Sequence, residues 1–156
     1  MSREYGQYCG LARALDVVGD RWNLLIVRQL LVAPARYRDL RDGLPGIATN
    51  LLTDRLRELE TAGVIERRLA EDTNAITYAL TEWGGAQLRE PIEGLIRWST
   101  PLMIRGGAQG DEFRAEWLLL ALPALFTGRR PTQSATVGID LDGEIIQRAP
   151  AAREST

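Results

Sequence analysis

The side chains that usually carry catalysis are almost absent from this 156-residue chain, which has no histidine and one cysteine, Cys9. Without histidine there is no Ser-His or Cys-His nucleophile pair, no imidazole general base and no typical zinc site. A pair of carboxylates for hydrolysis remains formally possible. However, the acidic residues are scattered among arginines along expected helices, as on solvated surfaces. We therefore expect no enzyme, no metal and no other cofactor.

Polar side chains suited to hydrogen bonding share one face of a helix expected over residues 49–62. The other face carries Leu52, Leu56 and Leu59 at helical spacing, which predicts a buried stripe. The polar face consists of Thr49, Asn50, Thr53 and Arg57. Such a face can offer donors and acceptors to base edges in the major groove of DNA.

Turn-forming residues bound this helix. A Pro-Gly turn at 45–46 leads into a start that we expect to be capped, and Gly63 ends the helix. Two strands are expected next, at 64–69 and 75–80. Helix, turn and hairpin in this order are typical of a winged helix-turn-helix, although proteins that bind no nucleic acid share the pattern.

Three arginines flank the expected reading helix. Arg36 and Arg38 lie on a short helix at 36–42, and Arg68 lies at the base of the hairpin. Each is a candidate phosphate contact, and the alternative is an ordinary solvated charge. The hairpin tip at 71–74 is acidic and is not expected to touch DNA.

The composition is that of a globular protein, with 45% hydrophobic and 26% charged residues. The net charge is −2, and residues 1–80 contain 11 arginines and 11 acidic residues. DNA binding would thus need arginines gathered on one face. No membrane-spanning run and no signal peptide are expected, and a single cysteine fits a reducing cytoplasm.

Six motifs occur in a specific order: CGLARAL at 9–15, GDRW at 19–22, RYRDL at 36–40, LPGI at 44–47, LLTDRLRELE at 51–60 and GVIER at 63–67. Together they resemble the HxlR-type winged-helix transcriptional regulators of bacteria, over roughly residues 9–104. The resemblance implies a homodimer whose seam is formed by the N-terminal helix and a long helix at 81–104. It also implies double-stranded DNA as the partner, a palindromic operator and repression.

The expected fold is mostly α with a small β wing, plus a C-terminal helix and β-hairpin. We expect a DNA-binding and dimerisation domain at 9–104, a linker at 105–110, an appendage at 111–148 and a flexible tail at 149–156. The appendage combines a helix at 111–126, apolar all round and so expected to be buried, with a hairpin. It resembles the opening of the sterol-carrier-like domain that some HxlR-type regulators carry, and we interpret it as a reduced version that buttresses the dimer.

Cys9 lies just before the first expected helix, at 11–18. The positive end of the helix dipole and Arg13 would lower the pKa of its thiol. In some family members a cysteine at this place is associated with sensing oxidants or electrophiles, so the resemblance implies a possible redox sensor. The alternative is a buried, inert residue beside the dimer seam.

These observations predict a cytoplasmic, homodimeric transcriptional repressor that responds to an oxidant or a small molecule. Two other classes remain open. One is a protein–protein adaptor that keeps the winged-helix shape without DNA affinity, and the other is a protein that binds a small apolar ligand through its C-terminal helix and hairpin.

Overall fold

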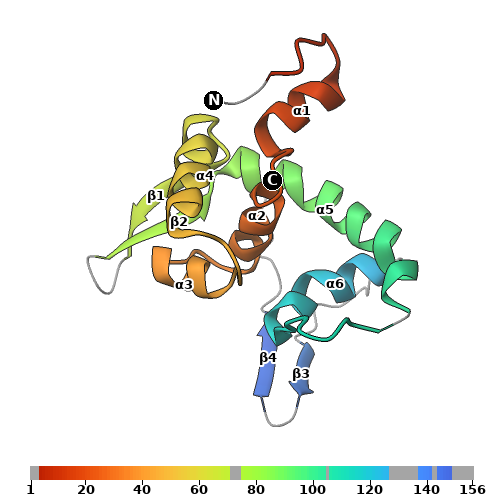
Figure 1. Ribbon diagram of the computed structural model, residues 1–156. Coiled ribbons are helices and arrows are strands. Elements are labelled where there is room, and N and C mark those ends of the chain that lie inside the picture. The colour runs from red at the N-terminus through yellow and green to blue at the C-terminus, as the bar shows by residue number, and fades with distance from the viewer. Residues whose placement is uncertain (1–3, 71–74, 105, 127–136, 142–143, 149–156) are drawn as a thin grey trace, which may run out of the picture. The chain divides into compact units, whose positions relative to one another are not determined.

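The computed structural model describes residues 4–70, 75–104, 106–126, 137–141 and 144–148. Its elements are α1 (Gly10–Val18), α2 (Asn23–Val32), α3 (Tyr37–Asp42), α4 (Thr49–Thr61), β1 (Ile65–Leu69), β2 (Ile76–Leu80), α5 (Glu82–Met103), the 3₁₀ turn η1 (Ala115–Trp117), α6 (Leu118–Leu125), β3 (Val137–Leu141) and β4 (Glu144–Arg148) (Figure 1). The fold is mostly helical with a small antiparallel wing, which confirms the fold class predicted from the sequence. Within the described ranges, no helix has the length and apolar character needed to cross a membrane.

The chain divides into two compact units, residues 1–92 and 93–156. The helix-turn-helix and the wing lie in the first unit, and the C-terminal helix and hairpin lie in the second. The functional boundaries expected at 104 and 110 stay predictions. The expected tail at 149–156 lies outside the described residues.

The core of the first unit is built from α2 and α4. The predicted stripe of α4, Leu52, Leu56 and Leu59, is buried, and α2 contributes the fully buried Ile26 and Val27. Since burial of this stripe fixes the rotation of α4, the opposite face of the helix must point to solvent. Trp22, directly before α2, is half-buried.

Gly63 ends α4 in the way the sequence predicts. Its φ of 74° lies in the left-handed region that glycine adopts without strain. The N–H of Gly63 donates to Glu60 O at 3.0 Å, and the N–H of Val64 donates to Leu59 O at 2.9 Å. This pair of bonds is a Schellman motif, which satisfies the last carbonyls of α4 and turns the chain into the wing.

The wing is the predicted hairpin. β1 and β2 pair antiparallel, with Ile65 opposite Leu80 and Leu69 opposite Ile76. Ala35 adds a single bridge to Tyr78, with N···O distances of 3.0 and 2.8 Å. The segment before α3 is thereby tied to the wing. The expected acidic tip at 71–74 lies outside the described residues.

Helix α5 follows the wing directly. Thr81 caps it, because its Oγ1 accepts from the Gly84 N–H at 3.0 Å. The absence of a side chain at Gly84 is required, since a Cβ there would lie 2.1 Å from the Val64 carbonyl oxygen. Pro91 lies within α5, yet the helix runs on without interruption to Met103. Pro91 and Gln87 are both exposed, so water can satisfy the carbonyl of Gln87 that loses its partner.

The expected C-terminal helix is shorter and less buried than its sequence suggests. Arg114 is extended, with φ −125° and ψ 130°, so η1 and α6 begin only after it. Burial is confined to Leu120 and Ala124, whereas Phe126 is 77% exposed. The expectation of a helix buried all round was therefore wrong. The hairpin β3–β4 is present as predicted, with Val137 opposite Arg148.

Candidate nucleic-acid interface

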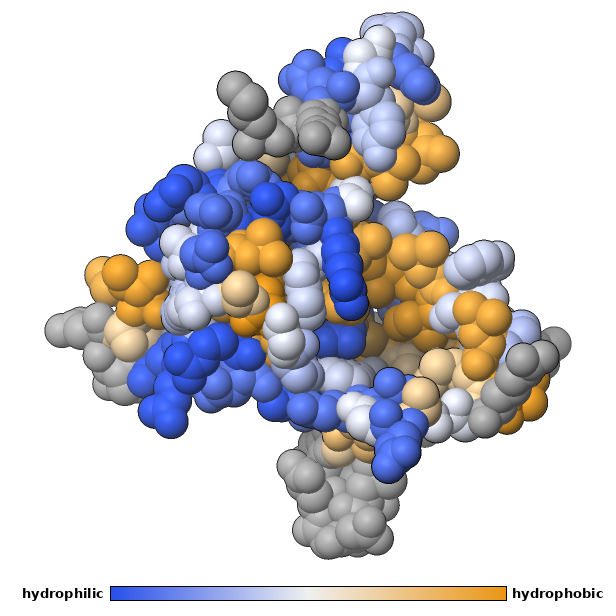
Figure 2. All heavy atoms as spheres, viewed as in Figure 1, coloured by the Kyte–Doolittle hydropathy of each residue, from blue (hydrophilic) through white to orange (hydrophobic). Residues whose placement is uncertain are grey.

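The polar face of α4 is open to solvent, as its sequence predicted. Thr49, Asn50, Thr53 and Arg57 are all exposed. Figure 2 shows hydrophilic side chains gathered over α3 and α4. The first turn of α4 and its exposed face thus present an acceptor, an amide and a guanidinium along one line of the helix.

The start of α4 differs from the expectation. Its N-cap is Ala48, which makes no side-chain capping bond. The predicted capped start was wrong, because the Pro-Gly turn, in which Gly46 has a φ of 83°, places an apolar residue at the cap position. The first N–H groups of α4 lack a side-chain cap, and such groups favour a nearby anion.

Tyr37 joins the two helices of the helix-turn-helix. Its hydroxyl donates to Thr49 O at 2.9 Å and lies 3.3 Å from Thr53 Oγ1. Thr53 Oγ1 itself donates to Thr49 O at 3.0 Å. Thr53 therefore faces solvent with its acceptor oxygen and its methyl group, its one proton being used within the helix. The hydroxyl of Tyr37 thus connects α3 to the first turn of α4.

Helix α3 presents its arginines to solvent. Arg36 and Arg38 are both exposed, and the backbone N–H of Arg36 donates to Asp39 Oδ2 at 3.1 Å, which fixes the start of α3. Arg38 Nε lies 3.7 Å from Asp42 Oδ2. The pair is largely exposed, so it holds Arg38 weakly and a phosphate can replace the carboxylate.

The wing arginines have different environments. Arg68 is half-exposed and pairs with Glu66, with Nε 2.6 Å from Glu66 Oε1. Arg67 Nε donates to Glu60 Oε1 of α4 at 2.8 Å, and this bond raises the pKa of Arg67 further above its usual range. Arg67 thus fastens β1 to α4, whereas among the described residues the guanidinium of Arg68 pairs with Glu66 of its own strand.

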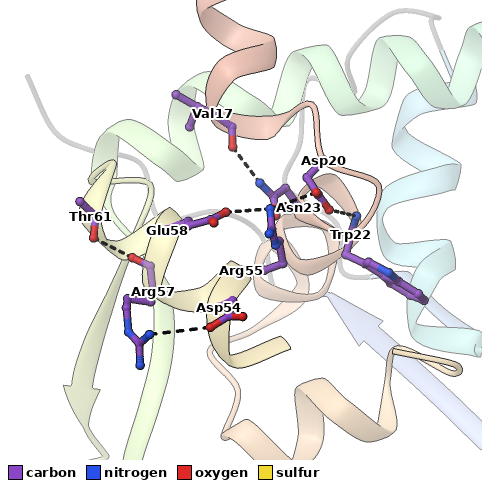
Figure 3. Close-up of polar contacts among 9 residues, drawn as sticks. All are labelled: Val17, Asp20, Trp22, Asn23, Asp54, Arg55, Arg57, Glu58 and Thr61. Atoms are coloured by element: carbon purple, nitrogen blue, oxygen red, sulfur yellow. Dashed lines mark hydrogen bonds and ion pairs between the residues drawn. The ribbon is translucent and has the colours of Figure 1, made fainter. Parts of the chain in front are cut away.

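Two neighbouring arginines of α4 have opposite roles (Figure 3). Arg55 is 19% exposed, and its Nη1 lies 3.0 Å from Asp20 Oδ2 and 2.8 Å from Glu58 Oε2. It therefore ties α4 to the turn between α1 and α2. Arg57 is 73% exposed and its Nη1 lies 3.7 Å from Asp54 Oδ1. No local sequence pattern indicates the pairing of Arg55 with Asp20, which is 35 residues away.

Cys9 is exposed and occupies the N-cap position of α1. The nearby backbone N–H groups of Ala12 and Leu11 at the start of α1 favour the thiolate and lower the pKa of the thiol. The helix start thereby lowers the thiol pKa as the sequence predicted. The expected contribution of Arg13 is not borne out, since its Nη1 lies 3.6 Å from Asp16 Oδ2 instead. The alternative of an inert cysteine covered at the dimer seam stays a prediction, since the structure describes a single chain.

A buried helix-turn-helix core, an exposed polar face on its second helix and an adjoining wing define a winged helix-turn-helix, a fold that many DNA-binding transcriptional regulators use. The chain belongs to the HxlR-like helix-turn-helix family, which it matches over residues 17–105.

Relatives of known sequence carry the same class of name. The HTH-type transcriptional regulator YvaP of Bacillus subtilis is 39% identical over 90 residues, which cover 56% of this chain and 82% of YvaP. The HTH-type regulator sll1512 of Synechocystis is 38% identical over 82 residues, 52% of this chain and 61% of that protein. The chain thus spans under two-thirds of sll1512 and most of YvaP.

Solved structures share the fold. Quinone-bound YodB from B. subtilis superposes with a TM-score of 0.51 at 31% identity, covering 58% of this chain and 96% of YodB. The redox regulator HypR in its oxidised form superposes with a TM-score of 0.54 at 28% identity, covering 60% of this chain and 96% of HypR. PA1607, a proposed transcription factor, gives 0.58 at 27% identity and covers 96% of both chains.

Proposed function

We propose that this transcriptional regulator is a homodimeric repressor that binds a (pseudo)palindromic operator in the cytoplasm and responds to oxidants through Cys9. The observation that carries the proposal is the exposed polar face of α4, held outward by a buried leucine stripe. In this proposal Thr49, Asn50, Thr53 and Arg57 read base edges. Arg36, Arg38 and Arg68 contact phosphates and position the protein.

Two exposed apolar stripes support the dimer. On α1 the residues Leu11 and Leu15 are exposed at a spacing of four. On α5 the residues Leu95, Trp98 and Leu102 are exposed at spacings of three and four. Figure 2 shows the hydrophobic side chains along α5. Because recognition helices must reach half-sites about one DNA turn apart, a two-fold dimer suits a palindromic operator.

The chemistry of Cys9 supports the redox response. Its thiol is exposed and its pKa is lowered, the two conditions under which a cysteine is readily oxidised. It is the only cysteine of the chain, so a disulfide would have to join two subunits or a small thiol. YodB is known in a quinone-bound form and HypR in an oxidised form, which makes an electrophile or an oxidant a reasonable effector.

The test is fluorescence anisotropy of labelled DNA from directly upstream of the protein's own gene. Binding should be tight, weaken with added salt because phosphate contacts release counterions, and fall on treatment with a thiol oxidant. Cys9→Ser should bind equally well but ignore the oxidant. Oxidation that weakens wild type and Cys9→Ser alike would refute the sensor. Salt-independent or absent binding, also to mixed genomic DNA, would refute the repressor.

An adaptor function without DNA affinity has one observation in its favour. The candidate phosphate contacts Arg38 and Arg68 each have a carboxylate partner in the same chain. An adaptor would show no salt-dependent affinity for DNA but would bind a partner protein.

A further inference from the structure

A carboxylate lies in the middle of the proposed reading face. Asp54 follows Asn50 by one helical turn and precedes Arg57 by three residues, so the three side chains share the exposed side of α4. Asp54 is 55% exposed. In this position a negative charge opposes the approach of phosphates, unless it has its own binding partner on the DNA.

The partner of Asp54 within the protein is Arg57 and not Arg55. Arg55 is turned away toward Asp20 and Glu58, whereas Arg57 Nη1 faces Asp54 Oδ1 at 3.7 Å (Figure 3). A guanidinium has five N–H donors in a planar fork. With Nη1 beside Asp54, its Nε and Nη2 groups can still donate outward. The exposed face thus presents an acceptor-only group beside a donor-only group.

We propose that Asp54 and Arg57 together read one C·G base pair. Guanine presents two neighbouring acceptors in the major groove, O6 and N7, which match a bidentate guanidinium. The cytosine N4 amino group is a donor, which matches a carboxylate. Guanine O6 and cytosine N4 are hydrogen-bonded to each other, so they lie about 3 Å apart, close to the separation within the protein pair. An A·T pair fits less well, because the adenine N6 donor separates its two acceptors.

This role makes Asp54 a specificity-determining residue. It restricts the orientation of Arg57, accepts from one base and repels DNA that offers no amino group there. The inference rests on the proposed operator binding. The competing interpretation is a solvated ion pair spaced by three residues, which contributes little to any function.

The experiment begins with selection of an operator by the wild-type protein from random double-stranded DNA. Each C·G pair of the selected half-site is then replaced by T·A, and affinities are measured by anisotropy at constant salt. For wild type, one replacement should weaken binding by roughly ten-fold. In Asp54→Asn and in Arg57→Ala the loss at that same pair should become smaller, and in the double variant it should disappear.

Glu112→Gln is the matched control. Glu112 is exposed and lies in the unit of residues 93–156. Its substitution removes one negative charge, as Asp54→Asn does. It should retain the wild-type preference. Far-UV circular dichroism verifies that each variant is folded, which we expect because Asp54 and Arg57 are both exposed.

The outcomes separate the inference from the proposed function. Equal gains in affinity of Asp54→Asn for the operator and for every substituted operator would show that Asp54 only repels DNA, and would overturn the inference. Loss of discrimination at different base pairs in the two variants, or a half-site without any C·G pair, would also overturn it. Failure of the wild type to select any sequence would refute the operator binding itself.

Discussion

At the scale of single residues, Arg38 pairs with an exposed carboxylate at the surface of α3. Arg38 lies 3.7 Å from Asp42, and its side chain is 82% exposed. Arg38→Ala should weaken binding to operator and random DNA by similar factors and lower the slope of log affinity against log salt by about one. Arg21→Ala is the control, since Arg21 is exposed at the end of the α1–α2 turn. An unchanged salt slope would remove Arg38 from the phosphate contacts.

Cys9 should titrate below an ordinary thiol, because the N–H groups of Ala12 and Leu11 stabilise its thiolate. The rate of alkylation by iodoacetamide should therefore reach half its maximum at a lower pH in the native protein than in the urea-unfolded chain. Because the pKa of the Cys9 thiol is lower in the folded than in the unfolded protein, its thiolate stabilises the folded state. This stabilisation is complete above the unfolded pKa and is lost as the pH falls through the folded pKa. Equal midpoints in the two states would contradict the structure around Cys9.

At the scale of elements, the connection from α4 to the wing depends on one left-handed residue. Gly63→Ala should cost about 1 kcal/mol of unfolding free energy, because alanine is strained at a φ of 74°. Urea denaturation measures this change. Gly10→Ala is the matched control: Gly10 opens α1, lacks a positive φ, and a Cβ there meets nothing within 4 Å. It should be neutral or slightly stabilising, and an equal loss in both variants would argue against a special role of Gly63.

At the scale of the whole molecule, the proposed function depends on association of two copies. Trp98 is 75% exposed at the centre of the apolar stripe of α5. Trp98→Glu should convert the dimer to a monomer in light scattering coupled to gel filtration, because a charge would then have to be buried in the seam. Operator affinity should fall with it. Leu69→Glu, at a similarly exposed position at the end of β1, should stay dimeric. A dimeric Trp98→Glu protein would place the seam elsewhere.

The local features of this protein could be predicted from its sequence. The leucine stripe of α4, the Gly63 stop and the paired strands of the wing each depend on residues a few positions apart, whose spacing directly reflects helix or strand geometry. The exposure of Thr49, Asn50, Thr53 and Arg57 followed, because burying one face of a helix exposes the other.

Only the tertiary structure decided which groups meet across long separations. The contact of Arg55 with Asp20 and that of Tyr37 with Thr49 depend on how folded helices approach each other, which no local pattern encodes. Burial of the C-terminal helix was overestimated for the same reason. Its apolar residues have the composition of a core helix, but burial requires a surface to pack against, and Leu120 and Ala124 alone are fully covered among the described residues of α6.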